Sequence, residues 1–584
     1  GAMDAIEIET FCAQHHIKLL IDAAHPFATQ LHETLEQVSV ESNIPVIRFE
    51  RIFPKRDEEH ITWCRDYDDA IEKIQKEKIF ILLALTGVQT IGKLKPLWQN
   101  ACCYFRILDR DSSRKLAREQ GFSEKNLYYY TPGEDEQVLM KQLHPEAILL
   151  KESGISGGFC EKVEAARQLG IRIFAICRPK TSGKFICVNG EHGLRRIIEK
   201  HLPDFFPLRS GLTTGTCAAA AAVAATWDVF NIYFKKRPTE FPVVLPNGET
   251  IQVPVEPQHH IPHSDLLENG DGMFETSATV IKDAGDDPDI TNGMKVVANI
   301  AIPFRIDDPL PEDTPQDAYN IIVCEGVGVV TMPGLGLELG SSAINDTPRE
   351  MIKKNVKLWL ERLHIAKQPN PILITISIPG GEEIAKRTFN PRLGIEGGIS
   401  IIGTSGIVKP FSSEAFVNSI RKSMEVAKAT QSPRIVISSG AKSERFIKAY
   451  YPDLPVQAFV HYGNFIGETL KIAAEEQVPH VTLGVMMGKA VKLAEGNLDT
   501  HSKKVTMNKE FIQDLARQTG CSEETLAAIG QMNLARELWD IIPEELLEKF
   551  GKALIELCHR HCAPLLPNGE LTVLLITENG KIYS

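Results

Sequence analysis

The sequence predicts a multidomain chain of mixed α/β and α+β class: a parallel α/β domain, an α+β domain with an antiparallel sheet, and a Rossmann-like α/β domain. Three observations support this prediction. The 584 residues suffice for several domains at about 150 residues each. Strand-like and helix-like segments alternate in the first third and again after Arg434, which is typical of parallel sheets. The region between is rich in glycine and β-branched residues, which favours antiparallel pairing.

The first domain is expected over residues 4–205. Short apolar runs at residues 17–22, 79–84, 147–150 and 171–176 are interpreted as buried strands. Segments with helical periodicity separate them. Two prolines between Leu202 and Pro207 mark the linker that ends this domain.

Three further parts follow. The α+β domain is expected over residues 208–430, with a hairpin turn at Pro246-Asn247-Gly248. The Rossmann-like domain is expected over residues 431–500, with ligands at the carboxyl ends of its strands. Residues 501–584 are interpreted as a helical C-terminal extension that closes with a terminal hairpin.

Composition and charge exclude several classes of function. The net charge of −12 argues against nonspecific nucleic-acid binding, because phosphate neutralisation needs a basic surface. No apolar stretch reaches the roughly 20 residues that span a bilayer, and no signal peptide is recognised, so no membrane association is predicted. The 12 cysteines are scattered, which favours reduced thiols and a cytoplasmic location.

The segment after Leu208 is unusual because small hydroxyl residues stand directly before a strong helix former. Thr213, Thr214 and Thr216 precede a run of alanines. Such a helix start offers free backbone N–H groups and the positive end of the helix dipole to an anion. The same pattern fits a capped helix packed closely in the core, and the sequence leaves both interpretations open.

An acidic loop follows at residues 285–293, where Asp286, Asp287 and Asp289 lie within four residues. These carboxylates suit a divalent ion, a cationic group or a proton. The loop lacks the ligand spacing of an EF-hand. An acidic surface turn explains the pattern equally well.

Glycine-dense segments at residues 326–336, 379–381 and 397–406 permit main-chain amides to approach a ligand, although tight turns explain each of them as well. None forms a Walker A or a complete dinucleotide-binding motif. Cys558 and Cys562 suggest a zinc ligand pair, but an amphipathic helix explains them better, and no metal site is predicted.

From Leu208 to about His501 these motifs resemble the cobalt-precorrin-5B C1-methyltransferase family, and the likeness extends more weakly to residue 584. The resemblance implies S-adenosylmethionine-dependent methylation at C1 of cobalt-precorrin-5B to give cobalt-precorrin-6A in anaerobic cobalamin biosynthesis. Its implied partners are the cobalt-containing tetrapyrrole substrate and other enzymes of that pathway. In chain order, the matching segments are Arg209–Ala219, Gly285–Gly293, Gly326–Gly328 with Thr331, Glu382–Gly394, Gly397–Gly406 and Gly488–His501.

Residues 4–205 resemble, more loosely, precorrin-6A reductase, through the run from Asp22 to Ala28 and the segment from Lys151 to Gly154. The family begins with a Gly-Gly-Thr-type nucleotide loop and a first βα unit, and this chain starts too late to contain them. We therefore expect an incomplete reductase-like domain, which weakens the case for NADH or NADPH as a second cofactor. The residues matched to that family are Asp22, His25, Lys151, Ser153, Gly154, Lys162 and Arg178.

Site residues in the methyltransferase-like region are expected in three groups. The catalytic candidates are Asp286, Asp287 and Asp289, for proton handling or for a cationic part of the methyl donor, together with His461. The candidates for binding the polycarboxylate substrate are Arg209, Thr213, Thr214, Gly215, Thr216, Arg349, Lys386, Arg387, Arg392, Thr404, Ser405 and Lys489. Those for S-adenosylmethionine, at the predicted strand ends, are Gly440, Tyr462, Gly463, Gly484 and Gly488.

Two alternatives remain open at this stage. In one, the reductase-like domain is also active and the chain is a bifunctional enzyme. In the other, the chain is a tetrapyrrole-binding carrier without catalysis. Turnover of a nicotinamide cofactor and transfer of label from S-adenosylmethionine distinguish them.

Overall fold

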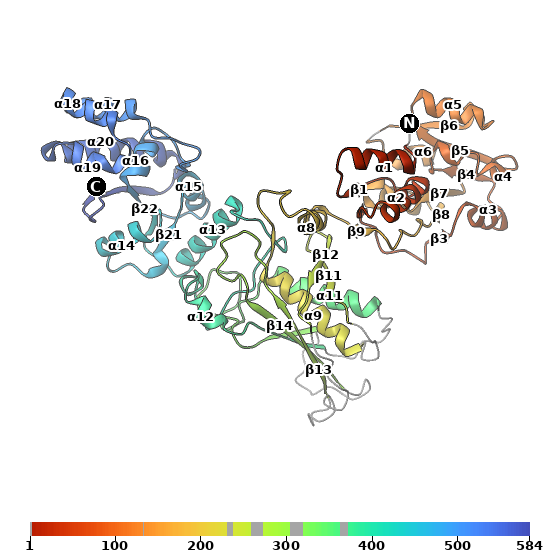
Figure 1. Cartoon of the computed structure of the whole chain (residues 1–584), viewed down its shortest axis with the longest axis horizontal. Helices are drawn as coiled ribbons and strands as arrows, with labels where there is room; N and C mark the ends of the chain where they lie inside the picture. Colours follow the sequence, from red (N-terminus) through yellow and green to blue (C-terminus); the bar gives the residue numbers. More distant parts are fainter. Residues whose placement is uncertain (1–2, 132, 231–236, 258–272, 304–318, 363–371) are drawn as a thin grey trace. The chain divides into compact units, whose positions relative to one another are not determined.

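The computed structural model describes residues 3–131, 133–230, 237–257, 273–303, 319–362 and 372–584. It divides the chain into two compact units. The first comprises residues 1–207 with 244–252, and the second comprises residues 208–243 with 253–584. Figure 1 colours the chain from red at the N-terminus to blue at the C-terminus. Parallel and antiparallel sheets are both present, as expected for a mixed fold class.

The first unit contains two parallel sheets. The larger has six strands in the order β3-β8-β7-β4-β5-β6, and the smaller has three in the order β1-β2-β9. The larger comprises β3 (Ile61–Cys64), β4 (Ile81–Ala84), β5 (Cys102–Leu108), β6 (Leu127–Tyr130), β7 (Ala147–Lys151) and β8 (Arg172–Ile176). The smaller comprises β1 (Leu20–Asp22), β2 (Val46–Phe49) and β9 (Ile186–Val188). The apolar run at residues 17–22 therefore yields a shorter strand in a separate sheet.

Helices cover both faces of the larger sheet, because alternate side chains of its strands enter different apolar clusters. Leu82 packs with Phe105 in one cluster, and Leu83 packs with Ile148 in the other. Strands buried on both faces explain why their sequences are almost continuously apolar. The α-helices of the first unit as a whole are α1 (Ala5–Gln14), α2 (Thr29–Glu41), α3 (Tyr67–Lys76), α4 (Lys95–Trp98), α5 (Asp111–Glu119), α6 (Glu136–Leu143), α7 (Phe159–Gln168) and α8 (Glu191–His201).

The first helix of the second unit is α9 (Thr214–Phe230), whose residues from Thr214 to Thr226 are all buried. Alanine side chains let this helix pack closely against both α11 (Asp346–Arg362) and strands β13 and β14. Its sheet has the order β13-β14-β17-β15, antiparallel except between β15 and β17. These strands are β13 (Met273–Ile281), β14 (Lys295–Pro303), β15 (Tyr319–Val323) and β17 (Ile372–Ser377).

Short elements complete this part of the unit. β10 (Gly211–Leu212) pairs with β19 (Ile407–Val408), and β16 (Val329–Val330) pairs with β18 (Ile395–Glu396). β11 (Glu240–Val244) and β12 (Thr250–Pro254) flank the turn expected at Pro246-Asn247-Gly248, and this turn belongs to the first unit. Helices α12 (Gly381–Ala385) and α13 (Ser413–Ala429) lead to the next sheet.

The C-terminal sheet has five strands in the order β21-β20-β22-β23-β24. Its strands are β20 (Ile435–Ser438), β21 (Phe459–His461), β22 (His480–Met486), β23 (Glu570–Ile576) and β24 (Ile582–Tyr583). β21 begins only at Phe459, because Pro455 is followed by a 3-10 turn. The helices are α14 (Ala441–Tyr450), α15 (Ile466–Glu475), α16 (Met487–Ala494), α17 (Lys509–Gln518), α18 (Glu523–Gln531), α19 (Leu538–Ile541) and α20 (Glu544–Cys562).

Residues 501–584 do not form a separate layer. β23 lies parallel to β22, and α20 packs against α16. The expected terminal hairpin is present as β23 and β24, with Gly580 in its turn. This segment therefore completes the sheet that begins at Ile435.

Candidate active sites

The start of α9 meets the glycine-rich loop before β19. The Thr213 hydroxyl accepts a hydrogen bond from the Thr216 backbone N–H at 3.2 Å, so Thr213 caps the helix. The Thr216 hydroxyl donates to the Gly406 carbonyl at 2.6 Å, and the Thr213 N–H donates to the same oxygen at 3.2 Å. Thr214, Gly215 and Thr216 are buried, while Thr213 is partly exposed.

Gly403 in this loop approaches Thr213 so closely that a side chain has no room. Its φ is +134°, and a Cβ there would lie 2.8 Å from Thr213 Cβ. Thr404 and Ser405 next to it are exposed, and the Ser405 hydroxyl donates to the Ile407 carbonyl at 3.1 Å. The loop thus presents two hydroxyl side chains beside a helix N-terminus.

Arg349 reaches the same region from the first turn of α11. The Asn345 N–H donates to the Ile401 carbonyl at 3.2 Å, which places the segment before α11 beside the glycine-rich loop. The Arg349 guanidinium donates to the Ile344 carbonyl at 3.2 Å and to the Ser342 hydroxyl at 3.0 Å. Main-chain and hydroxyl oxygens therefore hold the guanidinium, and no carboxylate of the described residues pairs with it.

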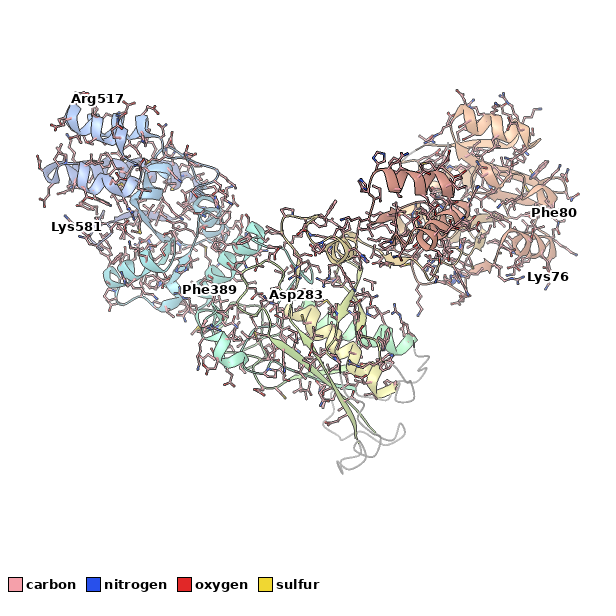
Figure 2. All side chains as sticks on the ribbon, in the orientation of Figure 1. Lys76, Phe80, Asp283, Phe389, Arg517 and Lys581 are labelled. Atoms are coloured by element: carbon pink, nitrogen blue, oxygen red, sulfur yellow. The ribbon has the colours of Figure 1, made fainter. Side chains whose placement is uncertain are left out.

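The acidic loop packs on the chain just before β10. The Arg209 guanidinium pairs with Asp283, which is labelled in Figure 2, at 2.5 and 2.8 Å. The Arg209 N–H donates to the Asp286 carboxylate at 2.6 Å. Asp287 accepts the Phe411 N–H at 2.9 Å. Asp286 is exposed and Asp287 half-buried. Both carboxylates thus lie near the surface, and their hydrogen bonds connect this loop to the backbone at Arg209 and Phe411.

Asp289 faces inward, toward the buried Lys282 ammonium, and it accepts the Thr291 N–H at 2.8 Å. Burial alone would raise the pKa of Asp289, but the Lys282 charge and the hydrogen bonds outweigh this and lower it. Asp289 is therefore ionised at neutral pH and held by a buried cation.

Several of the residues expected to bind the methyl donor lie at the carboxyl edge of the C-terminal sheet. Ser438 at the end of β20 is in register with His461 of β21 and with Gly484 of β22. Gly440 follows β20, and Gly488 opens α16 after β22. Both glycines have open space where a Cβ would stand. This edge is where parallel sheets usually bind small ligands.

Two residues expected at this edge form hydrogen bonds to carbonyl oxygens of the protein itself. Tyr462 is fully buried, its hydroxyl donates to the Gly484 carbonyl at 3.2 Å, and burial raises its pKa. The Lys489 ammonium donates to the Gly463 carbonyl and to the Asn464 side-chain oxygen. Burial, with a smaller effect of Lys492, lowers the pKa of Lys489 to about 8.

The remaining basic candidates, Lys386, Arg387 and Arg392, lie between β17 and β18. Lys386 pairs with Glu383 at 2.5 Å, and both side chains are exposed. Arg387 is exposed as well. Arg392 pairs with buried Glu444, which also contacts His461. These contacts connect residues 208–430 with the C-terminal sheet.

In the first unit, a cavity of about 230 Å³ opens at the carboxyl ends of β4, β5, β6 and β7. Its lining includes His25, Arg106, Lys151, Ser153 and Lys162. Burial and then the Arg51 and Lys151 charges lower the pKa of His25 to about 4. Burial lowers the pKa of Lys151 to about 8, with a smaller effect of Lys93. At neutral pH the cavity thus holds a neutral imidazole beside cationic side chains.

A second cavity of the same unit, about 260 Å³, is lined by His32, Arg48, Glu50 and Arg178 among others. Asp22 lies beneath it, at 2.8 Å from His32 and 3.0 Å from Arg48. The reductase-like candidates are therefore divided between two cavities. Gly154 lines neither and packs against Arg51.

Comparison with known proteins decides the family. Residues 202–410 match the family described as CbiD, residues 499–584 match the CbiD C-terminal domain, and residues 1–194 match the precorrin-6x reductase family CbiJ/CobK. Over 377 residues the chain is 40% identical to a cobalt-precorrin-5B C(1)-methyltransferase of Prosthecochloris aestuarii, covering 64% of this chain and 95% of the relative. The chain belongs to the cobalt-precorrin-5B C(1)-methyltransferase family.

Two solved structures match with low overall scores. The cobalamin biosynthesis protein CbiD from Archaeoglobus fulgidus is 26% identical, covers 51% of this chain and 83% of its own, and has a TM-score of 0.26. A CobK precorrin-6A reductase is 16% identical, covers 35% of this chain and 81% of its own, and has a TM-score of 0.30.

The structure brings several of the predicted residues of this cobalt-precorrin-5B C(1)-methyltransferase family member together. Thr213, Arg349, Thr404 and Ser405 surround the start of α9, and the acidic loop adjoins it through β10. Lys386, Arg387, Arg392 and Lys489 lie on other elements. The described residues contain no group of His, Cys, Asp or Glu side chains arranged to hold a metal ion.

Sequence reasoning missed several buried charges of this family member. Arg48 and Arg106 line the cavities of the first unit, and Glu444 anchors Arg392 in the second. A charged residue inside an apolar strand, as in the runs around Arg48 and Arg106, was the available signal.

Among the described residues, none of the helices has the length and apolar character needed to cross a membrane.

Proposed function

We propose that residues 208–584 catalyse S-adenosylmethionine-dependent methylation at C1 of cobalt-precorrin-5B to give cobalt-precorrin-6A, a step of anaerobic cobalamin biosynthesis. The observation that carries the proposal is the 40% identity over 95% of a relative with that activity in its name. We further propose that residues 208–430 bind the tetrapyrrole. The Rossmann-like sheet, residues 431–500 completed by 501–584, binds the methyl donor.

The start of α9 suits the carboxylates of a flat polycarboxylate substrate. A helix N-terminus favours negative charge, and Arg349 adds a fixed guanidinium beside it. Ile402, before β19, and Phe411, after it, are 54% and 67% exposed. These apolar side chains offer contact area to a macrocycle whose carboxylates are held at the helix start.

The carboxyl edge of the C-terminal sheet fits the methyl donor. Gly440 and Gly488 leave open space there, and the buried Ser438 hydroxyl has no hydrogen-bond partner among the described residues. A bound ligand with a polar edge satisfies that hydroxyl. S-Adenosylmethionine supplies an electrophilic sulfonium methyl group when it is bound.

The chain's main task in the chemical step is alignment. The methyl carbon's bond to sulfur breaks as its bond to C1 of the ring forms, and the reacting atoms must be held in line at near-attack distance. A ring N–H proton leaves as the macrocycle changes tautomer. Asp286 and Asp287, at the surface beside the start of α9, are placed to accept it, and His461 is a third candidate.

Transfer of isotopic label tests the activity. The intact chain, incubated with methyl-labelled S-adenosylmethionine and cobalt-precorrin-5B, is expected to place label in the tetrapyrrole. Tight binding of the pigment without transfer would support the carrier alternative instead. Thr213→Ala removes the cap of α9 and is expected to raise the KM for the tetrapyrrole.

A second candidate activity, reduction of cobalt-precorrin-6A with NADH or NADPH, is favoured by the family match over residues 1–194 and by the cavity around His25 and Lys151. Lys151 and Lys162 supply positive charge for an anionic substrate. The test is oxidation of the nicotinamide in the presence of the methylated product. No turnover at saturating cofactor would rule this activity out for the chain.

A further inference from the structure

One buried carboxylate in the second unit contacts the side chains of an arginine, a lysine and a histidine. Glu444 is 5% exposed, and its two oxygens accept hydrogen bonds from the Arg392 guanidinium at 2.7 and 2.8 Å. Lys448 Nζ lies 2.7 Å from one oxygen, and His461 Nε2 lies 2.5 Å from the other. The bidentate pair with Arg392 is the most directional of these contacts.

The cluster joins elements that are distant in the sequence. Arg392 belongs to a 3-10 turn (Asn390–Leu393) that precedes β18, while Glu444 and Lys448 lie on α14 and His461 ends β21. Glu444 stands in the first turn of α14, where the helix dipole stabilises a negative charge. Glu444 therefore fixes a loop of the proposed tetrapyrrole-binding part against the edge where the donor is proposed to bind.

The charges of the cluster do not cancel. Arg392, Lys448 and, when protonated, His461 share the single carboxylate, and no other carboxylate of the described residues pairs with them. Burial alone would raise the pKa of Glu444, but its contacts with His461, Arg392 and Lys448 hold that pKa far below its usual range. Glu444 is thus ionised, and the cluster keeps a net positive charge that attracts an anion.

An exposed aromatic ring covers one side of the cluster. Phe389, labelled in Figure 2, is 52% exposed, and its ring centroid lies 5.9 Å from that of His461. The Arg392 guanidinium lies 5.9 Å from the centre of the same ring. An apolar face beside two cationic groups suits a carboxylate carried by an organic molecule.

We propose that Glu444 is a positioning residue that holds Arg392 and His461 as a carboxylate-binding pair at the edge of the methyl-transfer site. Glu444 binds two of the five guanidinium N–H groups, which leaves the others for a ligand. The carboxylate belongs either to the tetrapyrrole or to the methionine moiety of the donor. The inference rests on the proposed methyltransferase activity.

Glu444→Gln tests the proposal, because it keeps the shape and removes the charge. The KM for one of the two carboxylate-bearing substrates is expected to rise about tenfold, while kcat changes less than about threefold. A rise for the tetrapyrrole assigns the carboxylate to it, and a rise for S-adenosylmethionine assigns it to the donor. The matched control is Asp228→Asn, because Asp228 is 17% exposed and pairs bidentately with Arg237 at 2.7 and 2.9 Å.

Arg392→Lys keeps the charge but loses the bidentate geometry, so it decides the question if Glu444→Gln does not fold. Arg392→Lys is expected to raise the same KM. The double variant Glu444→Gln/Arg392→Lys is expected to have a KM no higher than that of the more affected single variant. Unchanged KM values, or a loss in kcat alone, would overturn the positioning role. A wild-type chain without methyl transfer would overturn the proposed function instead, so the two failures are distinguishable.

Discussion

Gly403→Ala is expected to damage the proposed substrate site through a single added methyl group. That Cβ would stand 2.8 Å from both Cβ and Oγ1 of Thr213, so the cap of α9 must move. A side chain at positive φ costs about 1–2 kcal/mol, and loss of an N-cap costs about 1 kcal/mol. The free energy of unfolding should therefore fall by about 2–3 kcal/mol in total.

Gly336→Ala is the matched control. Gly336 has a φ of +73° and open space around its missing Cβ, so it incurs only the backbone cost. Urea unfolding and methyl-transfer kinetics are to be measured for both variants. Gly403→Ala should lower kcat/KM for the tetrapyrrole by at least about tenfold relative to the control, because the helix start loses its geometry. Equal kcat/KM in the two variants would refute the assignment of this helix start to the substrate.

Three further predictions address the other charged groups. Asp286→Ala should lower kcat at least about 100-fold, with the Tm within about 4 °C of wild type because an exposed residue loses one hydrogen bond; an unchanged kcat contradicts proton handling. The pKa of Lys151 falls from 10.5 to about 8 on folding, so the unfolded chain binds more protons between these values. Stability should therefore rise with pH there, by up to about 1.4 kcal/mol per pH unit relative to Lys151→Met, and equal slopes in urea titrations would refute it. Glu152 is 4% exposed and pairs with Arg56 and Arg178; Glu152→Gln should lower the free energy of unfolding by about 3 kcal/mol, whereas a loss below about 1 kcal/mol would contradict a buried anchor.

The sequence predicted those strands and helix ends that are determined by residues close together in the chain. The apolar runs 147–150 and 171–176 correspond to β7 and β8, and the threonine-alanine junction marks the start of α9. Thr213 was also expected as a capping hydroxyl, and its contact with the Thr216 N–H is present. Periodicity and capping depend on neighbours within one turn or strand, so the chain displays them directly.

Contacts between distant segments could not be predicted in this way. Arg392 and Glu444 are 52 residues apart, and their pairing depends on how a loop packs against α14. β23 joins the sheet begun by β20 only after several helices have intervened. The Tyr462 hydroxyl could equally face solvent at the end of β21, but it is buried and donates to the carbonyl of Gly484 on β22, two strands away in the sheet. The roles of the candidate site residues themselves stay predictions.

The most direct test of the central claim is the position of the transferred methyl group. The intact chain is incubated with cobalt-precorrin-5B and S-adenosylmethionine carrying ¹³C in its methyl group, and the product is examined by NMR. Methyltransferase activity predicts one new ¹³C-methyl signal that couples to C1 of the macrocycle. Unlabelled tetrapyrrole recovered from an otherwise folded, pigment-binding chain would contradict it.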